Sequence, residues 1–168
     1  MPGRMNLLEL HDVIQAVFGW TTTHLHEFVI GGTHFNLPDE FDGMEGVDEW
    51  KVTLAKVVRK GTKRFLYVYD FGGDWRHGVV VERVEPAAPG EDLPVCLAGN
   101  RHRPPEDCGG PLGYAGFLKA IREPSQKEHE AMLDWVGGSF DPEAFDLEAV
   151  NEDLSQGRPT ERDQDWLQ

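Results

Sequence analysis

The stretch of sequence that decides the fold runs from residue 64 to residue 81 and reads RFLYVYDFGGDWRHGVVV. Its first part, Arg64–Asp70, is apolar on both faces, which is typical of a strand inside a sheet. A second strand, Trp75–Val84, follows a turn in which Gly72 and Gly73 allow positive φ angles. The pattern predicts a β-hairpin in the centre of a sheet. The side chains brought together at its turn are then Asp70, Asp74, Trp75 and His77.

Helical spacing and capping residues predict elements before the hairpin. Apolar residues recur every three or four positions over residues 7–18, with Asn6 as the cap and Gly19 as the stop. Residues 31–49 are rich in Gly, Asp, Glu and Pro, so we expect an acidic excursion that is mobile or contacts a partner. A short helical turn is expected over residues 53–58.

A strand is also expected between the first helix and the acidic excursion. Polar and apolar residues alternate over Thr23–Ile30, and this alternation places His24 and His26 on one face together with Phe28 and Ile30. The two histidines are therefore expected to point the same way.

The second half of the chain reads as a loop followed by helices. Residues 86–111 hold six prolines and resist regular structure. Helices are expected over residues 114–121, over residues 125–135 with a capping box of Ser125 and Glu128, and from Asp141 to an end near Gly157.

These elements predict one α+β domain over residues 1–154. Its central sheet is antiparallel or mixed, with helices packed mainly on one side. Residues 155–168 are polar, and we expect a flexible C-terminal tail.

The charge of the chain limits its partners. With 30 acidic and 16 basic residues, the net charge is −14, and such a chain repels nucleic-acid phosphates. Direct nucleic-acid binding is therefore not expected, and we assign no nucleic-acid-binding residues. The locally basic residues 56–64 are interpreted as a solvated loop.

Cysteine use and hydropathy indicate the compartment. The chain has two cysteines, Cys96 and Cys108, no signal peptide, and no apolar stretch near the length of about 20 residues that spans a bilayer. We expect a reduced cytoplasmic protein with free thiols and no membrane association.

Polar and aromatic side chains gather in three short stretches, which we expect to meet in one site. The candidate functional cluster consists of His24, His26, Asp70, Asp74, Trp75, His77, Glu106, Asp107 and Cys108.

Three chemical readings of this cluster stay open. Imidazole and thiolate ligands suit zinc, so a tetrahedral site could form from His24, His26, His77 and Cys108. The alternative is that the histidines donate to backbone carbonyls or to Asp70 in a polar layer of the core. Asp70 and Asp74 could act as paired carboxylates with His77 as proton carrier, although aspartates commonly cap tight turns. A thiolate at Cys108 is disfavoured, because neighbouring carboxylates raise a thiol pKa.

The order of several motifs resembles one known family. The residues that carry the resemblance are His24-Leu25-His26-Glu27-Phe28, Tyr67-Val68-Tyr69-Asp70-Phe71-Gly72, Trp75 with His77, Cys96 with Gly99, Pro104-Pro105-Glu106-Asp107-Cys108-Gly109-Gly110 with Gly113-Tyr114, and Phe140-Asp141-Pro142. From about Leu7 to Leu154 the chain resembles the plasmid pRiA4b ORF-3-like family, which includes TnpR passenger proteins carried beside transposases in insertion elements. The resemblance implies no established reaction.

Two features depart from the family pattern. Members typically begin with a further strand containing a Trp-Arg-Arg-like stretch, whereas six residues precede the first helix here. The sheet then lacks an edge strand, or that strand comes from a partner chain or an upstream start codon, and an uncovered edge can pair with another chain. Gly73 stands where the family more often has an acidic residue.

Three functional hypotheses follow. The first is a non-enzymatic accessory or adaptor protein of mobile elements that acts through contacts with mobile-element proteins or with itself. The second is a metal-dependent enzyme, such as a hydrolase, that uses His24, His26 and His77. The third is an acidic mimic of nucleic acid that binds a transposase or nuclease.

Overall fold

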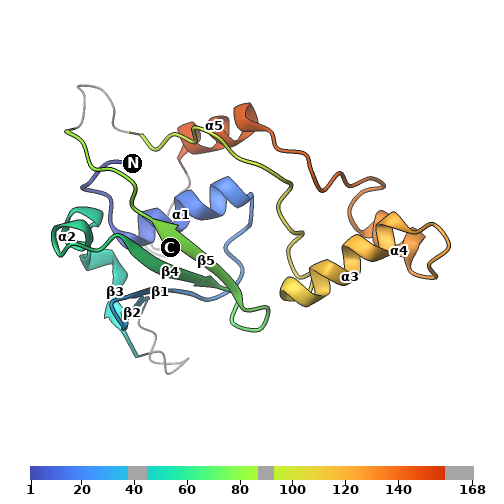
Figure 1. Ribbon diagram of the computed structural model, residues 1–168, viewed down its shortest axis with the longest axis horizontal. Helices are drawn as coiled ribbons and strands as arrows, with labels where there is room; N and C mark the ends of the chain where they lie inside the picture. The colour runs from blue at the N-terminus through green and yellow to red at the C-terminus, as the bar shows by residue number, and fades with distance from the viewer. Residues whose placement is uncertain (38–44, 87–92, 158–168) are drawn as a thin grey trace, which may run out of the picture.

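A computed structural model describes residues 1–37, 45–86 and 93–157 (Figure 1). The elements in chain order are α1 (Leu7–Phe18), β1 (His26–Ile30), β2 (Thr33–Asn36), β3 (Val47–Asp48), the 3-10 helix η1 (Glu49–Lys51), α2 (Leu54–Arg59), β4 (Arg64–Tyr69), β5 (Trp75–Val80), α3 (Gly110–Arg122), α4 (His129–Trp135) and α5 (Leu147–Gln156). The predicted α+β class is confirmed.

The five strands form one mixed sheet in the order β3-β2-β1-β4-β5. Its antiparallel pairs are β1 with β2, β1 with β4, and β4 with β5, and β2 pairs with β3 in parallel. The predicted hairpin is the β4–β5 pair. β4 is internal, as its apolar run indicated, but β5 lies at the edge, so the expected central position holds for one strand of the hairpin only.

Local capping explains why α1 begins and ends where the sequence predicts. Asn6 accepts a hydrogen bond from the Glu9 backbone N–H, and the Glu9 side chain accepts one from the Asn6 N–H, which makes a capping box. Gly19 ends the helix with φ of 56°, a left-handed conformation that glycine adopts without steric cost.

One face of the sheet packs against α1 and α2. The buried apolar side chains that form this core are Met5, Leu7, Leu10, Trp20, Phe28, Ile30, Val57, Phe65, Tyr67 and Tyr69. They alternate along β1 and β4, so one face of each strand packs against the helices, and Val68 on the other face of β4 is buried as well. In Figure 1, α3 and α4 extend away from the sheet and pack on each other, so the helices do not all lie over one face.

A chain of polar side chains crosses this core. Nε2 of the buried His26 lies 2.9 Å from Oε1 of Glu49, whose side chain is fully buried. The His26 ring stacks on the ring of His11, with centroids 3.5 Å apart. Nδ1 of His11 lies 2.8 Å from the hydroxyl of Tyr67, which also accepts a hydrogen bond from Gln15 Nε2.

The hydrogen-bond donors and acceptors can be assigned at the Gln15 end of this polar network. Gln15 Oε1 accepts from the Thr22 N–H, so its Nε2 is the group that donates to Tyr67. Burial holds the pKa of Tyr67 far above its usual value, so the hydroxyl keeps its proton. The Tyr67 hydroxyl, which accepts from Gln15, thus has a proton to donate toward His11 Nδ1.

Three sequence-based expectations were wrong in part. Within residues 31–49, the described part contains β2, β3 and the start of η1, because strand pairing continues where composition indicated an excursion; residues 38–44 lie outside the described residues. Helix α4 begins at His129, after a Glu128 cap without a side-chain bond, so the expected capping box is absent. Helix α5 begins after Asp146, because Asp141 caps only a local turn.

The end of α5 agrees with the prediction. The helix continues to Gln156 and Gly157 is its C-cap, so the first two residues of the predicted tail, 155 and 156, are helical. The rest of the predicted tail, residues 158–168, lies outside the described residues.

Replacing Glu49 by alanine tests the buried network. The substitution removes the partner of a buried imidazole, and we expect it to lower the free energy of unfolding by about 3 kcal/mol. Urea unfolding followed by tryptophan fluorescence measures the change. Lys51→Ala is the control, because the Lys51 side chain is 76% exposed in its ion pair with Asp48 and its loss should cost under about 1 kcal/mol. Equal effects of the two substitutions would contradict this account.

Candidate functional site

The turn between β4 and β5 is built by aspartates, and the expected positive φ angles of Gly72 and Gly73 were wrong. Asp70 and Asp74 hold φ of 54° and 55° instead. Asp70 Oδ1 accepts a hydrogen bond from the Gly72 N–H, and the Asp70 carbonyl accepts one from Asp74. Aspartate tolerates this conformation because its carboxylate bonds the neighbouring backbone.

Space is tight where Gly73 meets the start of α3. A Cβ on Gly110 would collide with the Gly73 carbonyl. A Cβ on Gly73 would collide with the Asp70 carboxylate, which is the end of a side chain, and would make an ordinary contact with the Gly110 backbone. The hairpin turn and the start of α3 therefore approach each other closely, and the backbone leaves no room for a side chain at Gly110.

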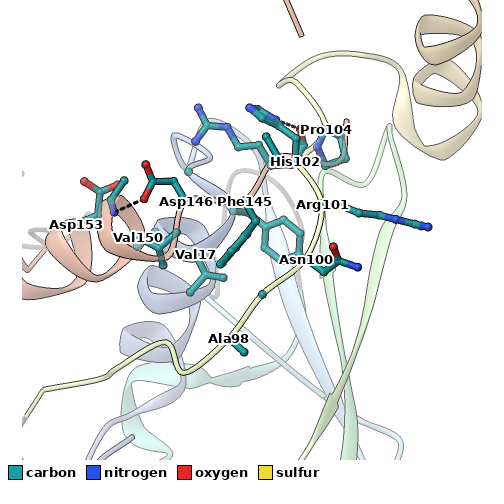
Figure 2. Close-up of a pocket in the computed structure, with 17 residues that line it drawn as sticks. Val17, Ala98, Asn100, Arg101, His102, Pro104, Phe145, Asp146, Val150 and Asp153 are labelled. Atoms are coloured by element: carbon teal, nitrogen blue, oxygen red, sulfur yellow. Dashed lines mark hydrogen bonds between the residues drawn. The ribbon is translucent and has the colours of Figure 1, made fainter. Parts of the chain in front are cut away.

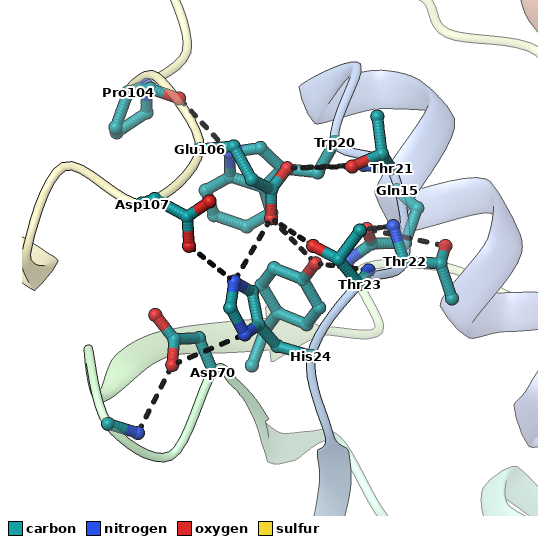
Figure 3. A network of polar contacts seen from close by, with 12 residues as sticks. Gln15, Trp20, Thr21, Thr22, Thr23, His24, Asp70, Pro104, Glu106 and Asp107 are labelled. Atoms are coloured by element: carbon teal, nitrogen blue, oxygen red, sulfur yellow. Dashed lines mark hydrogen bonds and ion pairs between the residues drawn. The ribbon is translucent and has the colours of Figure 1, made fainter.

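Glu106 ties the proline-rich segment to the sheet. Its Oε1 accepts a hydrogen bond of 2.7 Å from the Tyr69 hydroxyl, and its Oε2 accepts one of 3.2 Å from the Thr21 N–H (Figure 3). Burial, followed by the bond to Glu106, raises the pKa of Tyr69, so its hydroxyl remains a donor. Nearby, Trp20 Nε1 donates to the Pro104 carbonyl. The expected meeting of the proline-rich loop with the hairpin is present.

His24 lies among three carboxylates at this junction. Its Nε2 is 2.9 Å from Asp107 Oδ1 and 3.9 Å from Glu106 Oε1, and its Nδ1 is 3.9 Å from Asp70 Oδ1. Figure 3 shows the imidazole between these side chains. About 30% of the His24 side chain is exposed, against 72% for Asp107, and contacts at such exposure are weak individually.

Cys108 follows these acidic residues and is half-buried. Burial raises the pKa of its thiol, and Asp107, Asp70 and Glu106 raise it further. The direction agrees with the sequence-based expectation. At neutral pH the thiol therefore stays protonated, which makes it a poor nucleophile and a poor metal ligand.

The other candidate histidines lie elsewhere. The strand begins at His26, three residues later than expected, because the chain bends at His24, and His26 is bound to Glu49 inside the core. His77 packs against the rings of Phe18 and Trp20. The proposed set of His24, His26, His77 and Cys108 is thus not assembled as one group, and within the described residues no three His, Cys, Asp or Glu side chains could hold a metal ion.

The two remaining candidates have structural partners. Asp74 Oδ1 accepts a 2.8 Å hydrogen bond from Arg76 Nε. The Trp75 ring lies 5.8 Å from that of Trp20 and 6.3 Å from that of Tyr114, measured between centroids. Trp75 thus helps join β5 to α3.

A cavity of about 600 Å³ lies beside the junction, between the C-terminal end of α1, residues 98–104 and the start of α5 (Figure 2). Its wall is mainly apolar, and Phe145 packs so closely on Gly99 that no side chain fits there. None of the nine candidate residues lines the cavity.

Sequence reasoning missed the buried polar residues His11, Gln15 and Glu49. His11 and Gln15 are four positions apart and lie on the same apolar side of α1. Buried polar side chains need hydrogen-bond partners, so two of them at this spacing indicate a shared polar partner in the core. Glu49 gave no such signal, because its burial depends on η1 being placed beside β1.

The comparisons with known proteins agree with this architecture. The family described as Plasmid pRiA4b ORF-3-like protein matches residues 1–149. The chain belongs to this family. It is 40% identical over 153 residues to the protein "Uncharacterized protein y4hQ" of Sinorhizobium fredii, with 90% of this chain and 78% of that protein covered. It also resembles the crystal structure of the protein of unknown function MM3350 from Methanosarcina mazei Go1, with a TM-score of 0.78, 36% identity, and 88% and 84% of the two chains covered.

The resemblance found in the sequence is therefore confirmed. Neither the family nor these two similar proteins are named for a reaction. Among the helices described in the structure, none has the length and apolar character needed to cross a membrane.

His77→Leu tests the environment of the third histidine. Burial lowers the pKa of His77, so in acid the unfolded chain binds a proton at this residue that the folded chain resists. The contribution of the neutral His77 to the free energy of unfolding is complete above about pH 6.5. It is lost as the pH falls from there toward the lowered pKa of His77 in the folded state. Thermal unfolding between about pH 7 and pH 5 should therefore depend less on pH in the variant. His34→Gln, at an exposed residue, is the control; an unchanged pH slope in His77→Leu would contradict the assignment.

Proposed function

We propose that this chain is a non-enzymatic accessory protein that acts by binding other proteins, and that it receives an extended segment of its partner along β5. The proposal is supported by the open edge of that strand. Within the described residues, β4 is the only strand paired with β5. Unpaired backbone groups on a sheet edge are a template for a further strand.

The outward backbone groups of β5 can be identified. The Val81 N–H donates to the Lys63 carbonyl, so Val81 points its backbone groups toward the β4 side. In an antiparallel pair this direction alternates from residue to residue. The backbone N–H and C=O groups directed away from β4 are then those of Arg76, Gly78 and Val80.

The two ends of the sheet differ in how open they are. β3 has two residues, and so short an edge offers little for another strand to pair with. β5 has six residues and contains no proline. Val80 is 50% exposed, so an apolar side chain accompanies the outward backbone groups.

The chemistry of the junction supports binding over catalysis. The Cys108 thiol has a raised pKa, and the His24 imidazole lies among carboxylates. The Tyr69 hydroxyl donates to Glu106. These contacts hold three chain segments together. The family description points to plasmids, which supports partners encoded by mobile elements, and the charge of −14 disfavours direct binding to nucleic acid.

Val80→Pro tests the proposal. Proline removes the outward N–H of Val80 and is tolerated on an edge strand whose N–H groups face solvent. Val80→Thr is the matched control, since threonine keeps the N–H and suits a strand. Each protein is used to capture partners from a lysate of the native host, with quantitative mass spectrometry as the readout. Before capture, circular dichroism establishes that both variants are folded.

We expect the wild-type protein and Val80→Thr to capture the same partner, and Val80→Pro to recover it at least tenfold less. Equal capture by the two variants, or no reproducible partner of the wild-type chain, would rule out β5 as the binding edge.

A further inference from the structure

We infer that the segment received by β5 runs antiparallel to it and carries a bulky aromatic side chain opposite Gly78, an aliphatic side chain opposite Val80 and a carboxylate opposite Arg76. This inference rests on the proposed function and specifies the partner. It follows from the shape and charge of the surface beside the outward-facing backbone groups.

Gly78 leaves a gap on the exposed face of the sheet. A Cβ placed on Gly78 would have no heavy atom within 4 Å, and its φ lies outside the left-handed region. Neither backbone conformation nor crowding therefore requires glycine here. Opposite Gly78 in β4 is Leu66, which is half-buried and lacks a side-chain neighbour on the β5 side at that position.

An aromatic residue on an added strand can fill this gap. A residue directly opposite Gly78 projects its side chain to the same face as Leu66. A large ring there lies across the glycine and reaches the next strand, an arrangement known to compensate for glycine in sheets. The ring removes apolar surface of Leu66 from water, so we expect preference for phenylalanine over alanine at this position.

The flanking residues set the rest of the pattern. Val80 is 50% exposed on the same face, which suits an aliphatic neighbour. Arg76 has a side chain that is 63% exposed, and its partner Asp74 is 53% exposed, so this ion pair is well solvated. The exposed Arg64 lies opposite Val80 in β4. The guanidinium groups of Arg76 and Arg64 thus flank this part of the edge, and a carboxylate on the added strand opposite Arg76 complements them.

The orientation follows from the geometry of strand pairing. Antiparallel pairs outnumber parallel ones and are slightly more stable per residue. Read from its N-terminus, the added strand therefore presents its aliphatic, aromatic and acidic residues at every second position.

A second copy of this chain fits the edge less well. The outward-facing residues of β5 are Arg76, Gly78 and Val80, so another β5 offers no aromatic side chain for the gap. A symmetric pair centred on Gly78 would place glycine opposite glycine. Two chains with a charge of −14 each also repel one another.

The test is a titration of ¹⁵N-labelled full-length chain with capped seven-residue peptides up to millimolar concentration, followed through the backbone amide signals of β5. The probe has threonine at odd positions, with valine, phenylalanine and glutamate at positions two, four and six. One control peptide replaces phenylalanine by alanine, and another replaces glutamate by lysine. Gly78→Val, which fills the gap but keeps the N–H, and Val80→Pro are titrated in parallel; Arg76→Pro replaces the latter if it does not fold.

We expect the probe to bind the wild-type chain about threefold more tightly than the alanine peptide, the size of one favourable cross-strand pair. The lysine peptide should bind more weakly than the probe, and Gly78→Val should lose the preference for phenylalanine. Equal binding of the phenylalanine and alanine peptides, with loss of both in Val80→Pro, would overturn this inference and leave the proposed function standing. No shift of β5 signals with any peptide, or shifts that persist in Val80→Pro, would overturn both. A dimer sensitive to Val80→Pro in sedimentation would make a second copy the occupant and also overturn the inference.

Discussion

Two tyrosine hydroxyls of β4 hold the rest of the chain to the sheet. Tyr67 and Tyr69 both project into the core, and each ends in a polar group that needs a partner there. The Tyr67 hydroxyl meets His11 and Gln15 of α1, whereas the Tyr69 hydroxyl meets Glu106. One strand thus fixes the helix that covers the core and the proline-rich segment that leads to α3.

This arrangement places the polar cluster and the open edge on different sides of β4. The junction of His24, Asp70 and Glu106 lies where β1 and β4 meet the proline-rich segment, and its side chains are engaged with one another (Figure 3). The outward backbone groups of β5 lie on the other side of β4 and have no strand as partner within the described residues. The residues that the sequence singles out by their chemistry therefore support the scaffold, while the binding surface that we propose consists of backbone, valine and a glycine gap.

Locally encoded features were predicted well from the sequence. The bounds of α1 follow from Asn6, Glu9 and Gly19, whose effects act within one helical turn. The pairing of β4 with β5 follows from two apolar runs joined by a short turn. The meeting of Glu106 with the hairpin was also anticipated from the clustering of motifs.

Features that depend on long-range contacts were missed. Glu49 is buried because β3 and η1 follow β2 along the sheet, which an acidic composition does not reveal. The start of α5 depended on a choice between Asp141 and Asp146, which have the same local capping chemistry. His24 and His26 are two residues apart but have different surroundings, because strand alternation holds only where the chain is a strand and β1 starts at His26.

Amide hydrogen exchange of Tyr69→Phe, with Tyr67→Phe as the matched variant, tests the central role of the two hydroxyls most directly. Each substitution removes one oxygen and keeps the ring. The Tyr69 hydroxyl accepts from the Thr23 N–H, and its acceptor Glu106 accepts from the Thr21 N–H. Loss of a hydrogen bond to a carboxylate is worth about 1.5–3 kcal/mol, so Tyr69→Phe should speed exchange at Thr21 and Thr23 roughly tenfold or more and leave α1 unchanged. Tyr67→Phe should speed exchange in α1. Unchanged exchange at Thr21 and Thr23 of Tyr69→Phe, or the same increase across the chain in both variants, would contradict the account.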